Sequence, residues 1–147
     1  MNIKKATSKD FNKLYKLGLK TKEFQVNPNE LFMAKDEFES RIKDKNDLLL
    51  LAEENNKILG FILFGLKDAD RPLKNKCACL TYLVVNQKYR KKGIAQILYN
   101  ESIKKLKKKK IKIIYGWACE ESKSIRKFVK KQGFLEGNKY IWIEKKL

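Results

Sequence analysis

The chain has 147 residues, 43% of them hydrophobic, with 35 Lys and Arg against 17 Asp and Glu and a formal charge of +18. These values predict one globular domain over residues 1–147 with affinity for polyanions, and the absence of histidine excludes Ser-His-Asp and Cys-His mechanisms. The longest apolar run, residues 58–66, is far shorter than the roughly 20 residues that span a bilayer, so we expect a soluble, cytoplasmic protein without a membrane partner.

The N-terminal part of the chain predicts a short strand followed by two helices. Residues 2–6 can form a strand, and Thr7-Ser8-Lys9-Asp10 has the form of a capping box, which starts a helix. Residues 22–34 are expected to be irregular, with a turn at Asn27-Pro28-Asn29, before a second short helix over residues 37–43.

The middle of the chain predicts three strands. Residues 47–53 and 58–65 are apolar runs separated by a polar turn, which is typical of a hairpin. A polar loop over residues 67–76 then leads to residues 80–85 (LTYLVV), whose β-branched and aromatic side chains predict a central strand.

The C-terminal part predicts two strands separated by a helix. Residues 110–117 form one strand, and residues 122–132 form a helix that Gly133 ends. Residues 139–145 alternate aromatic with aliphatic side chains, which predicts a last strand. The three cysteines are an odd number and lack CxxC spacing, so we expect reduced thiols and no metal site.

The connection between the central strand and the next helix carries the chemistry. Arg90-Lys91-Lys92-Gly93 is a basic turn, and from Ile94 the apolar residues recur at helical spacing. The start of a helix points unpaired backbone N–H groups and the positive end of the helix dipole at one spot. Gly93 allows a phosphate to approach the backbone. The turn therefore predicts a pyrophosphate cradle, although its spacing matches neither the P-loop nor GxGxxG.

Arg90-x-x-Gly93-x-Ala95, placed after a strand that ends in Val85, resembles the acetyl-CoA signature (Q/R)xxGx(G/A) of the GNAT superfamily of N-acetyltransferases. Residues 128–134 resemble a second segment of that family, and the order of predicted elements is similar as well. The resemblance implies an α+β, three-layer α/β domain. Its central sheet would be mixed, mostly antiparallel and splayed at the central strands, with about four flanking helices.

The resemblance also implies acetyl-CoA as co-substrate and assigns residues to it. The thioester oxygen would accept a hydrogen bond from the backbone N–H of Val85, or of Val84. The pantetheine arm would pair with the edge of the central strand, and the pyrophosphate would lie on the turn. The residues expected to bind the cofactor are Leu83, Val84, Val85, Arg90, Lys91, Lys92, Gly93, Ile94, Ala95 and Ser122.

Three positions depart from the family pattern. Val129 stands where a tyrosine usually protonates the leaving thiolate, Ser122 replaces an asparagine that touches the cofactor, and Cys79 replaces the glutamate base of histone-type members. The acid and the base are therefore open. The candidates near the splayed strands are Tyr82, Tyr115, Cys119 and Glu120.

We expect an acyl-CoA-dependent N-acetyltransferase, an acyltransferase that acetylates a primary amine of a small molecule, a peptide N-terminus or a lysine by direct attack in a ternary complex. A non-catalytic acyl-CoA-binding protein of the same fold and a basic RNA- or ribosome-associated module are the alternatives. The lysine run over residues 104–110 suits a solvated helix end, so we expect any nucleic-acid binding to be weak and non-specific. The acceptor, the oligomeric state (a homodimer is one option) and a polyanionic partner stay open.

Overall fold

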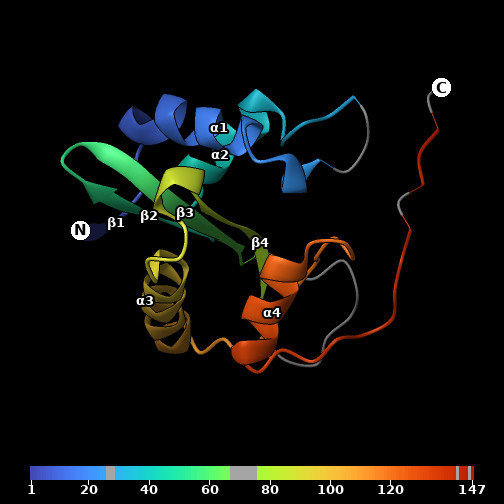
Figure 1. Ribbon diagram of the computed structural model, residues 1–147. Coiled ribbons are helices and arrows are strands. Elements are labelled where there is room, and N and C mark those ends of the chain that lie inside the picture. The colour runs from blue at the N-terminus through green and yellow to red at the C-terminus, as the bar shows by residue number, and fades with distance from the viewer. Residues whose placement is uncertain (26–28, 67–75, 142, 146) are drawn as a thin grey trace.

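The computed structural model describes residues 1–25, 29–66, 76–141, 143–145 and 147. Within these residues a five-stranded sheet of order β1-β2-β3-β4-β5 separates two helical layers (Figure 1). The first four strands pair antiparallel in sequence order, and β5 runs parallel to β4. This confirms the expected mixed, mostly antiparallel sheet. The strands are β1 (Asn2–Lys5), β2 (Asp47–Glu54), β3 (Lys57–Gly65), β4 (Cys77–Val85) and β5 (Ile113–Gly116).

Four α-helices cover the two faces of the sheet in the described residues, as expected (Figure 1). One face carries α1 (Phe11–Leu19) and α2 (Lys35–Lys43), and the other carries α3 (Ile94–Lys108) and α4 (Lys123–Lys131). Three short 3-10 helices accompany them: η1 (Ser8–Asp10), η2 (Lys22–Phe24) and η3 (Gln87–Tyr89). None of the helices in the described residues is long and apolar enough to cross a membrane.

Both faces of the central strands are buried, which explains why β2 and β3 are continuous apolar runs rather than alternating ones. Side chains of successive residues point to opposite faces, so each strand contributes to two cores. Leu49, Leu51, Phe61 and Leu63 pack toward α1 and α2. Leu48, Leu50, Ile62 and Phe64 pack toward α3.

Two local predictions are confirmed in detail. The Asp10 carboxylate accepts hydrogen bonds from the backbone N–H and the hydroxyl of Thr7, at 2.9 and 2.8 Å, as a capping box requires. Asn55 and Asn56 both have positive φ angles, 48° and 60°, in the turn between β2 and β3. Asparagine tolerates this conformation, which two-residue hairpin turns favour.

Other boundaries differ from the predictions. β4 begins at Cys77, earlier than expected, and β5 is limited to Ile113–Gly116. The predicted strand over residues 139–145 is wrong for its described residues, which belong to no strand and lie in an exposed segment. A strand forms only where another strand supplies its hydrogen bonds, and in the part of the chain that the structure describes no strand pairs with this segment. The predictions for residues 26–28, 67–75 and Trp142 lie outside the described residues.

Candidate functional site

β4 and β5 separate halfway along β4, as the splayed sheet requires. Their last paired residues are Leu80 and Gly116, and beyond them β4 continues to Val85, paired among the described strands with β3 alone. The register between β3 and β4 shifts at the same place, because Leu63 pairs with Tyr82 while Phe64 pairs with Leu80. Thr81 is thus the extra residue of a β-bulge, which bends and twists a strand. The sequence analysis did not identify this bulge.

The open edge of β4 presents the backbone of Val85. Arg90 Nε donates to the carbonyl oxygen of Val85 at 3.1 Å, and the next N–H, that of Asn86, donates to Leu59 of the neighbouring β3 at 2.8 Å. A Cβ atom added to Gly60 of β3 would lie 2.4 Å from the Val84 carbonyl oxygen, so that oxygen faces β3. In an antiparallel strand the N–H and C=O of one residue point the same way. Val85, not Val84, therefore offers an N–H to the open edge.

The turn after β4, where the pyrophosphate cradle is predicted, has an exposed backbone at the start of α3. Lys91 and Gly93 have positive φ angles of 64° and 75°, and Gly93 immediately precedes α3. The first helical hydrogen bond runs from Ile97 N–H to the Gly93 carbonyl oxygen at 3.1 Å. The N–H groups of Ile94, Ala95 and Gln96 therefore have no carbonyl acceptor within the helix. No described atom lies within 4 Å of a Cβ built on Gly93, so the turn is open to a ligand.

The three cations of the turn lie on its exposed surface. Besides its bond to Val85, Arg90 places Nη1 3.4 Å from the Glu23 carboxylate of η2. Lys92 Nζ lies 5.7 Å from the centre of the Tyr89 ring. Glu23 was not among the predicted site residues. Because its partner is far away in the sequence, no local pattern indicated the contact.

Tyr82 lies on the face of the sheet that α1 and α2 cover. Its ring packs 4.5 Å from Phe24 and 4.8 Å from Phe32, measured between centroids. Burial, followed by the nearby Glu37 carboxylate, raises the pKa of Tyr82 to about 12, although Arg41 and a hydrogen bond with the Met33 backbone act in the opposite direction. Tyr82 is therefore a neutral phenol at physiological pH, suited to donate a proton or hydrogen bond and not to act as a base.

The other candidates come from β5 and the loop after it. Tyr115 is half-buried and pairs with Cys79 of β4. Ile114 packs toward α3, so the alternation of a strand places Tyr115 on the opposite face, the same face as Tyr82. Cys119 is exposed. Glu120 forms an ion pair with Lys139, whose hydrogen bond lowers the pKa of the Glu120 carboxyl, which makes Glu120 a weak base.

The α4 positions have structural surroundings of their own. Ser122 is the residue before α4, and its N–H donates to the Cys119 carbonyl oxygen at 3.0 Å. Val129 packs against the core on the α3 side of the sheet, next to Phe128, whose ring meets that of Tyr99 edge-on at 5.8 Å. Val129 therefore contributes packing and carries no group that could transfer a proton.

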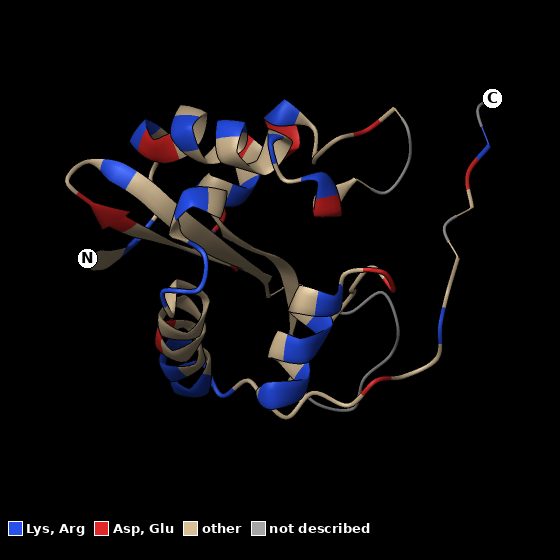
Figure 2. Cartoon of the chain, viewed as in Figure 1, with Lys and Arg blue, Asp and Glu red and all other residues tan. Residues whose placement is uncertain are grey.

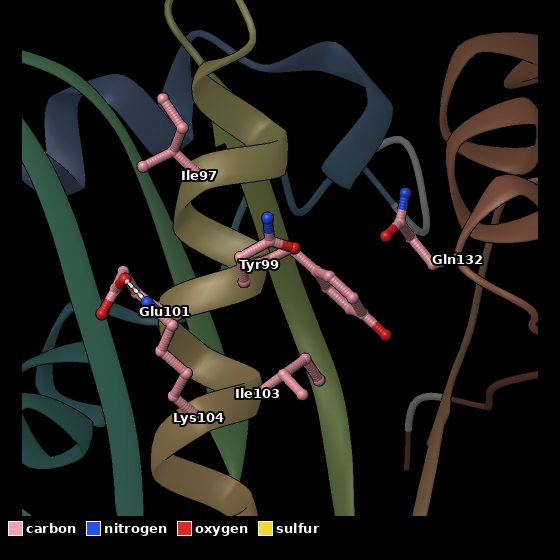
Figure 3. Close-up of a pocket in the computed structure, with 7 residues that line it drawn as sticks. Ile97, Tyr99, Glu101, Ile103, Lys104 and Gln132 are labelled. Carbon is pink, nitrogen blue, oxygen red and sulfur yellow. Dashed lines mark hydrogen bonds and ion pairs between the residues drawn. The ribbon is translucent and has the colours of Figure 1, made fainter.

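A cavity of about 600 Å³ lies between α3 and α4 (Figure 3). None of the predicted site residues lines it. The side-chain amides of Gln96 and Gln132 exchange hydrogen bonds of 2.9 and 2.8 Å and join the two helices. The predicted cradle lies at the start of α3, whereas the cavity runs along its middle. Its lining residues are Ile97, Tyr99, Asn100, Glu101, Ile103, Lys104 and Gln132.

Comparisons with known proteins agree with this architecture. The sequence model described as "Acetyltransferase (GNAT) family" matches residues 11–134. No curated protein matches the sequence. A tetramutant of the BH1408 protein of Bacillus halodurans has a similar structure, with TM-score 0.82, 17% identity, and coverage of 98% of this chain and 99% of that chain.

Two enzymes have the same fold at similarly low identity. The aminoglycoside 6'-N-acetyltransferase AAC(6')-IG of Acinetobacter haemolyticus matches with TM-score 0.79 and 18% identity, covering 100% of this chain and 99% of that chain. The PaiA N-acetyltransferase of Thermoplasma acidophilum, solved in complex with coenzyme A, matches with TM-score 0.77 and 19% identity, covering 95% of this chain and 92% of that chain. At such identities the likeness establishes the fold.

Proposed function

The chain belongs to the GNAT family of acetyltransferases, and we propose that it transfers the acetyl group of acetyl-CoA to a primary amine by direct attack in a ternary complex. The observation that carries the proposal is the open edge of β4 directly before an open cradle. Val85 presents its backbone to this edge, and Gly93 begins the cradle next to it. One extended, phosphate-bearing molecule could contact both.

The cradle supplies what a pyrophosphate needs. The N–H groups of Ile94, Ala95 and Gln96 and the positive end of the α3 dipole favour an anion at this position. Arg90, Lys91 and Lys92 add full charges around it, with Gly93 leaving the backbone accessible. The complex of the Thermoplasma acidophilum relative with coenzyme A supports the same ligand class here. Ser122, at the start of α4, would contact another part of the cofactor.

The edge of β4 would bind the pantetheine arm and the thioester. The amides of the arm can pair with the outward-facing backbone of Leu83 and Val85 as an added strand would. The Val85 N–H would then donate to the thioester oxygen as negative charge develops there. Removing one such donor typically lowers kcat by about 10²–10³-fold. The hydrogen bond from the Val85 N–H would therefore account for a large part of the catalysis.

The acceptor amine would approach from the face that carries α1 and α2. The neutral amine attacks the acetyl carbon, the carbon–sulfur bond breaks, and its electron pair leaves with the CoA sulfur. The nitrogen loses one proton and the thiolate gains one. Tyr82 of β4 and Tyr115 of β5 bring phenols to this face, but a CoA thiol has a pKa of roughly 8.5, so water suffices to protonate it.

Two other functions are favoured by specific observations. A protein that binds acyl-CoA without turnover is favoured by Val129, which packs against the core at the position where the family pattern has a tyrosine. An RNA- or ribosome-associated module is favoured by charge, since α3 and α4 together hold nine Lys and Arg against one Glu (Figure 2). Binding of acetyl-CoA would distinguish the non-catalytic acyl-CoA-binding protein from the RNA module. Turnover of acetyl-CoA would distinguish an enzyme from both of these alternatives.

The experiment that tests the proposal follows release of free thiol from acetyl-CoA over a panel of acceptors. The panel contains simple amines, polyamines, peptides with free N-termini and aminoglycosides, the last because the Acinetobacter haemolyticus enzyme shares this fold. Calorimetry with acetyl-CoA is run in parallel. Binding with turnover supports the enzyme, binding without turnover supports the non-catalytic protein, and no binding overturns both.

A further inference from the structure

The Arg90 side chain donates to a backbone group that the pantetheine arm of the cofactor would use. We propose that Arg90 determines specificity: its guanidinium covers the end of the β4 edge until a diphosphate draws it to the cradle, so that the arm binds well only as part of a nucleotide thioester. The inference rests on the proposed function, because it concerns the same edge and the same turn. It adds a discrimination between acetyl-CoA and thioesters that have the arm alone.

The open edge of β4 offers the backbone groups of two residues. Val84 faces β3, so Leu83 and Val85 face the opposite side of the strand. In the described residues β5 pairs with β4 only as far as Leu80 and Gly116. An arm that adds as a strand would therefore pair with the N–H and C=O groups of Leu83 and Val85.

One of these groups already accepts a hydrogen bond from a side chain. Arg90 Nε donates to the Val85 carbonyl oxygen at 3.1 Å, an ordinary length for a bond of this kind. An amide of the arm would place its nitrogen at a similar distance from the same oxygen. A carbonyl oxygen has two lone pairs, but the arm would approach from the open side of the strand, where the guanidinium lies. Arg90 and the arm therefore compete for the last residue of the edge.

A second contact holds the guanidinium beside this edge. Arg90 Nη1 lies 3.4 Å from the Glu23 carboxylate of η2, and both side chains of this ion pair are 42% exposed. The next residue of η2, Phe24, packs its ring 4.5 Å from that of Tyr82 in β4. The guanidinium thus bridges β4 and η2. Exposed ion pairs are weak, so a stronger anion can replace Glu23.

A diphosphate is a stronger partner for Arg90 than either of these groups. The guanidinium binds phosphate oxygens through parallel, charge-assisted hydrogen bonds, which are stronger than a bond to a neutral carbonyl. The diphosphate is expected at the start of α3, and Arg90 stands in the same turn, three residues before Gly93. Rotation about the side-chain bonds of Arg90 would carry the guanidinium from the edge to the cradle while the strand stays in place.

The two halves of the cofactor would then favour each other's binding. The diphosphate draws Arg90 away from the Val85 carbonyl, and the arm in turn displaces Arg90 toward the diphosphate. Such coupling is reciprocal, so each half raises the affinity of the other by the same factor. A thioester without a diphosphate has to displace Arg90 without this compensation. The protein would therefore discriminate against acetyl-pantetheine, although its acetyl group and its arm are those of acetyl-CoA.

The test measures the affinity of acetyl-pantetheine, which carries no phosphate, by calorimetry and NMR titration. Arg90→Ala should raise this affinity roughly fivefold or more, the lower end of typical coupling, while it lowers the affinity for acetyl-CoA. Glu23→Gln weakens the contact that holds Arg90 and should also raise the acetyl-pantetheine affinity. Lys92→Ala is the matched control and should leave that affinity unchanged, because Lys92 belongs to the same turn but places Nζ over the Tyr89 ring. Circular dichroism checks that each variant folds.

ADP, which carries the diphosphate of the cofactor, provides the second measurement. Saturating ADP should raise the acetyl-pantetheine affinity of the wild type by a factor similar to that of Arg90→Ala, and should have little effect in that variant. If Arg90→Ala lowers the affinity for both thioesters, Arg90 only supports the turn and the proposal is overturned. An acetyl-pantetheine affinity that stays unchanged or undetectable with Arg90→Ala and with ADP overturns it as well. Failure of the wild type to bind acetyl-CoA would instead overturn the proposed function.

Discussion

Arg90 Nε donates a hydrogen bond of 3.1 Å to the carbonyl oxygen of Val85, which ties the first residue of the basic turn to the last residue of β4. The same guanidinium approaches Glu23 of η2 at 3.4 Å. Arg90 therefore joins the turn to the strand edge and to the α1 side of the domain. The residue expected to bind the pyrophosphate also holds the turn in place.

Replacement of Arg90 should consequently weaken cofactor binding in two ways. We expect Arg90→Ala to lower acetyl-CoA affinity by roughly tenfold, since it removes a charge-assisted contact and the support of the turn. Calorimetry measures the change. Lys88→Ala, which removes an exposed cation of η3, is the control and should bind nearly as the wild type does. Equal losses in the two variants would mean that overall charge, not the position of Arg90, governs affinity.

Gly93 should be sensitive to a bulky anion. Gly93→Glu places a carboxylate where the pyrophosphate is expected, so acetyl-CoA affinity should fall at least about tenfold, or about 1.4 kcal/mol. Gly133→Glu is a matched control, because Gly133 also has a positive φ, 85°, and open space around it, but lies after α4. Both variants pay the backbone strain of a side chain at positive φ. A folded Gly93→Glu protein with unchanged affinity would contradict the cradle.

Proline substitutions test the oxyanion donor. Val85→Pro removes an N–H that faces the open edge, so the sheet should tolerate it while kcat falls by about 10²–10³-fold. Val84→Pro removes an N–H that faces β3 and should destabilise the fold. Thermal unfolding and the thiol-release assay give the two readouts. Full activity in a folded Val85→Pro protein would exclude this donor.

The phenol of Tyr82 predicts a stability change at high pH. Its folded pKa of about 12 lies above the ordinary value of 10.0, so the neutral form stabilises the fold below pH 10, and this contribution is lost as the pH rises from about 10 to about 12. Tyr82→Phe should reduce the alkaline loss of stability, measured by urea unfolding. A Tyr82→Phe protein that loses stability over this pH range as steeply as the wild type would contradict the assignment.

The same variant, together with Tyr115→Phe, separates the two routes for the leaving thiolate. If water protonates the thiolate, both variants should keep most of kcat, and the rate should rise with pH as the acceptor amine deprotonates. Loss of most of kcat in either variant, with acetyl-CoA binding intact, would identify that phenol as the acid.

The lysine run at the end of α3 should matter little for the cofactor. Residues 76–147 hold 20 of the 35 Lys and Arg but only 5 of the 17 Asp and Glu, so 15 of the 18 net charges lie there. Replacing Lys107, Lys108 and Lys109 by Gln should leave acetyl-CoA affinity nearly unchanged. Nucleic-acid binding, measured by fluorescence anisotropy, should be weak and fall steeply with salt. A sequence-preferring RNA complex that survives moderate salt would favour the RNA module.

The sequence was sufficient to predict those features whose physical cause lies within a few neighbouring residues. The capping box of Thr7 and Asp10 and the start of α3 after Gly93 each depend on residues a few positions apart. The side-chain and backbone preferences of neighbouring residues determine such local structures without contacts from distant segments. The same holds for the apolar runs of β2 and β3, whose length and composition are typical of buried strands. These patterns predicted the order of elements and the position of the basic turn before α3.

The tertiary structure decided whatever depends on which segments become neighbours. The bulge at Thr81 follows from the register of β4 against β3. The same register determines that the backbone N–H of Val85, and not that of Val84, points to the open edge. The contact of Arg90 with Glu23 joins segments far apart in the chain. The strand pattern of residues 139–145 was recognisable, yet the described residues of this segment belong to no strand. A side-chain pattern states a preference, but strand pairing needs a second backbone at hydrogen-bonding distance, and only the folded arrangement supplies it.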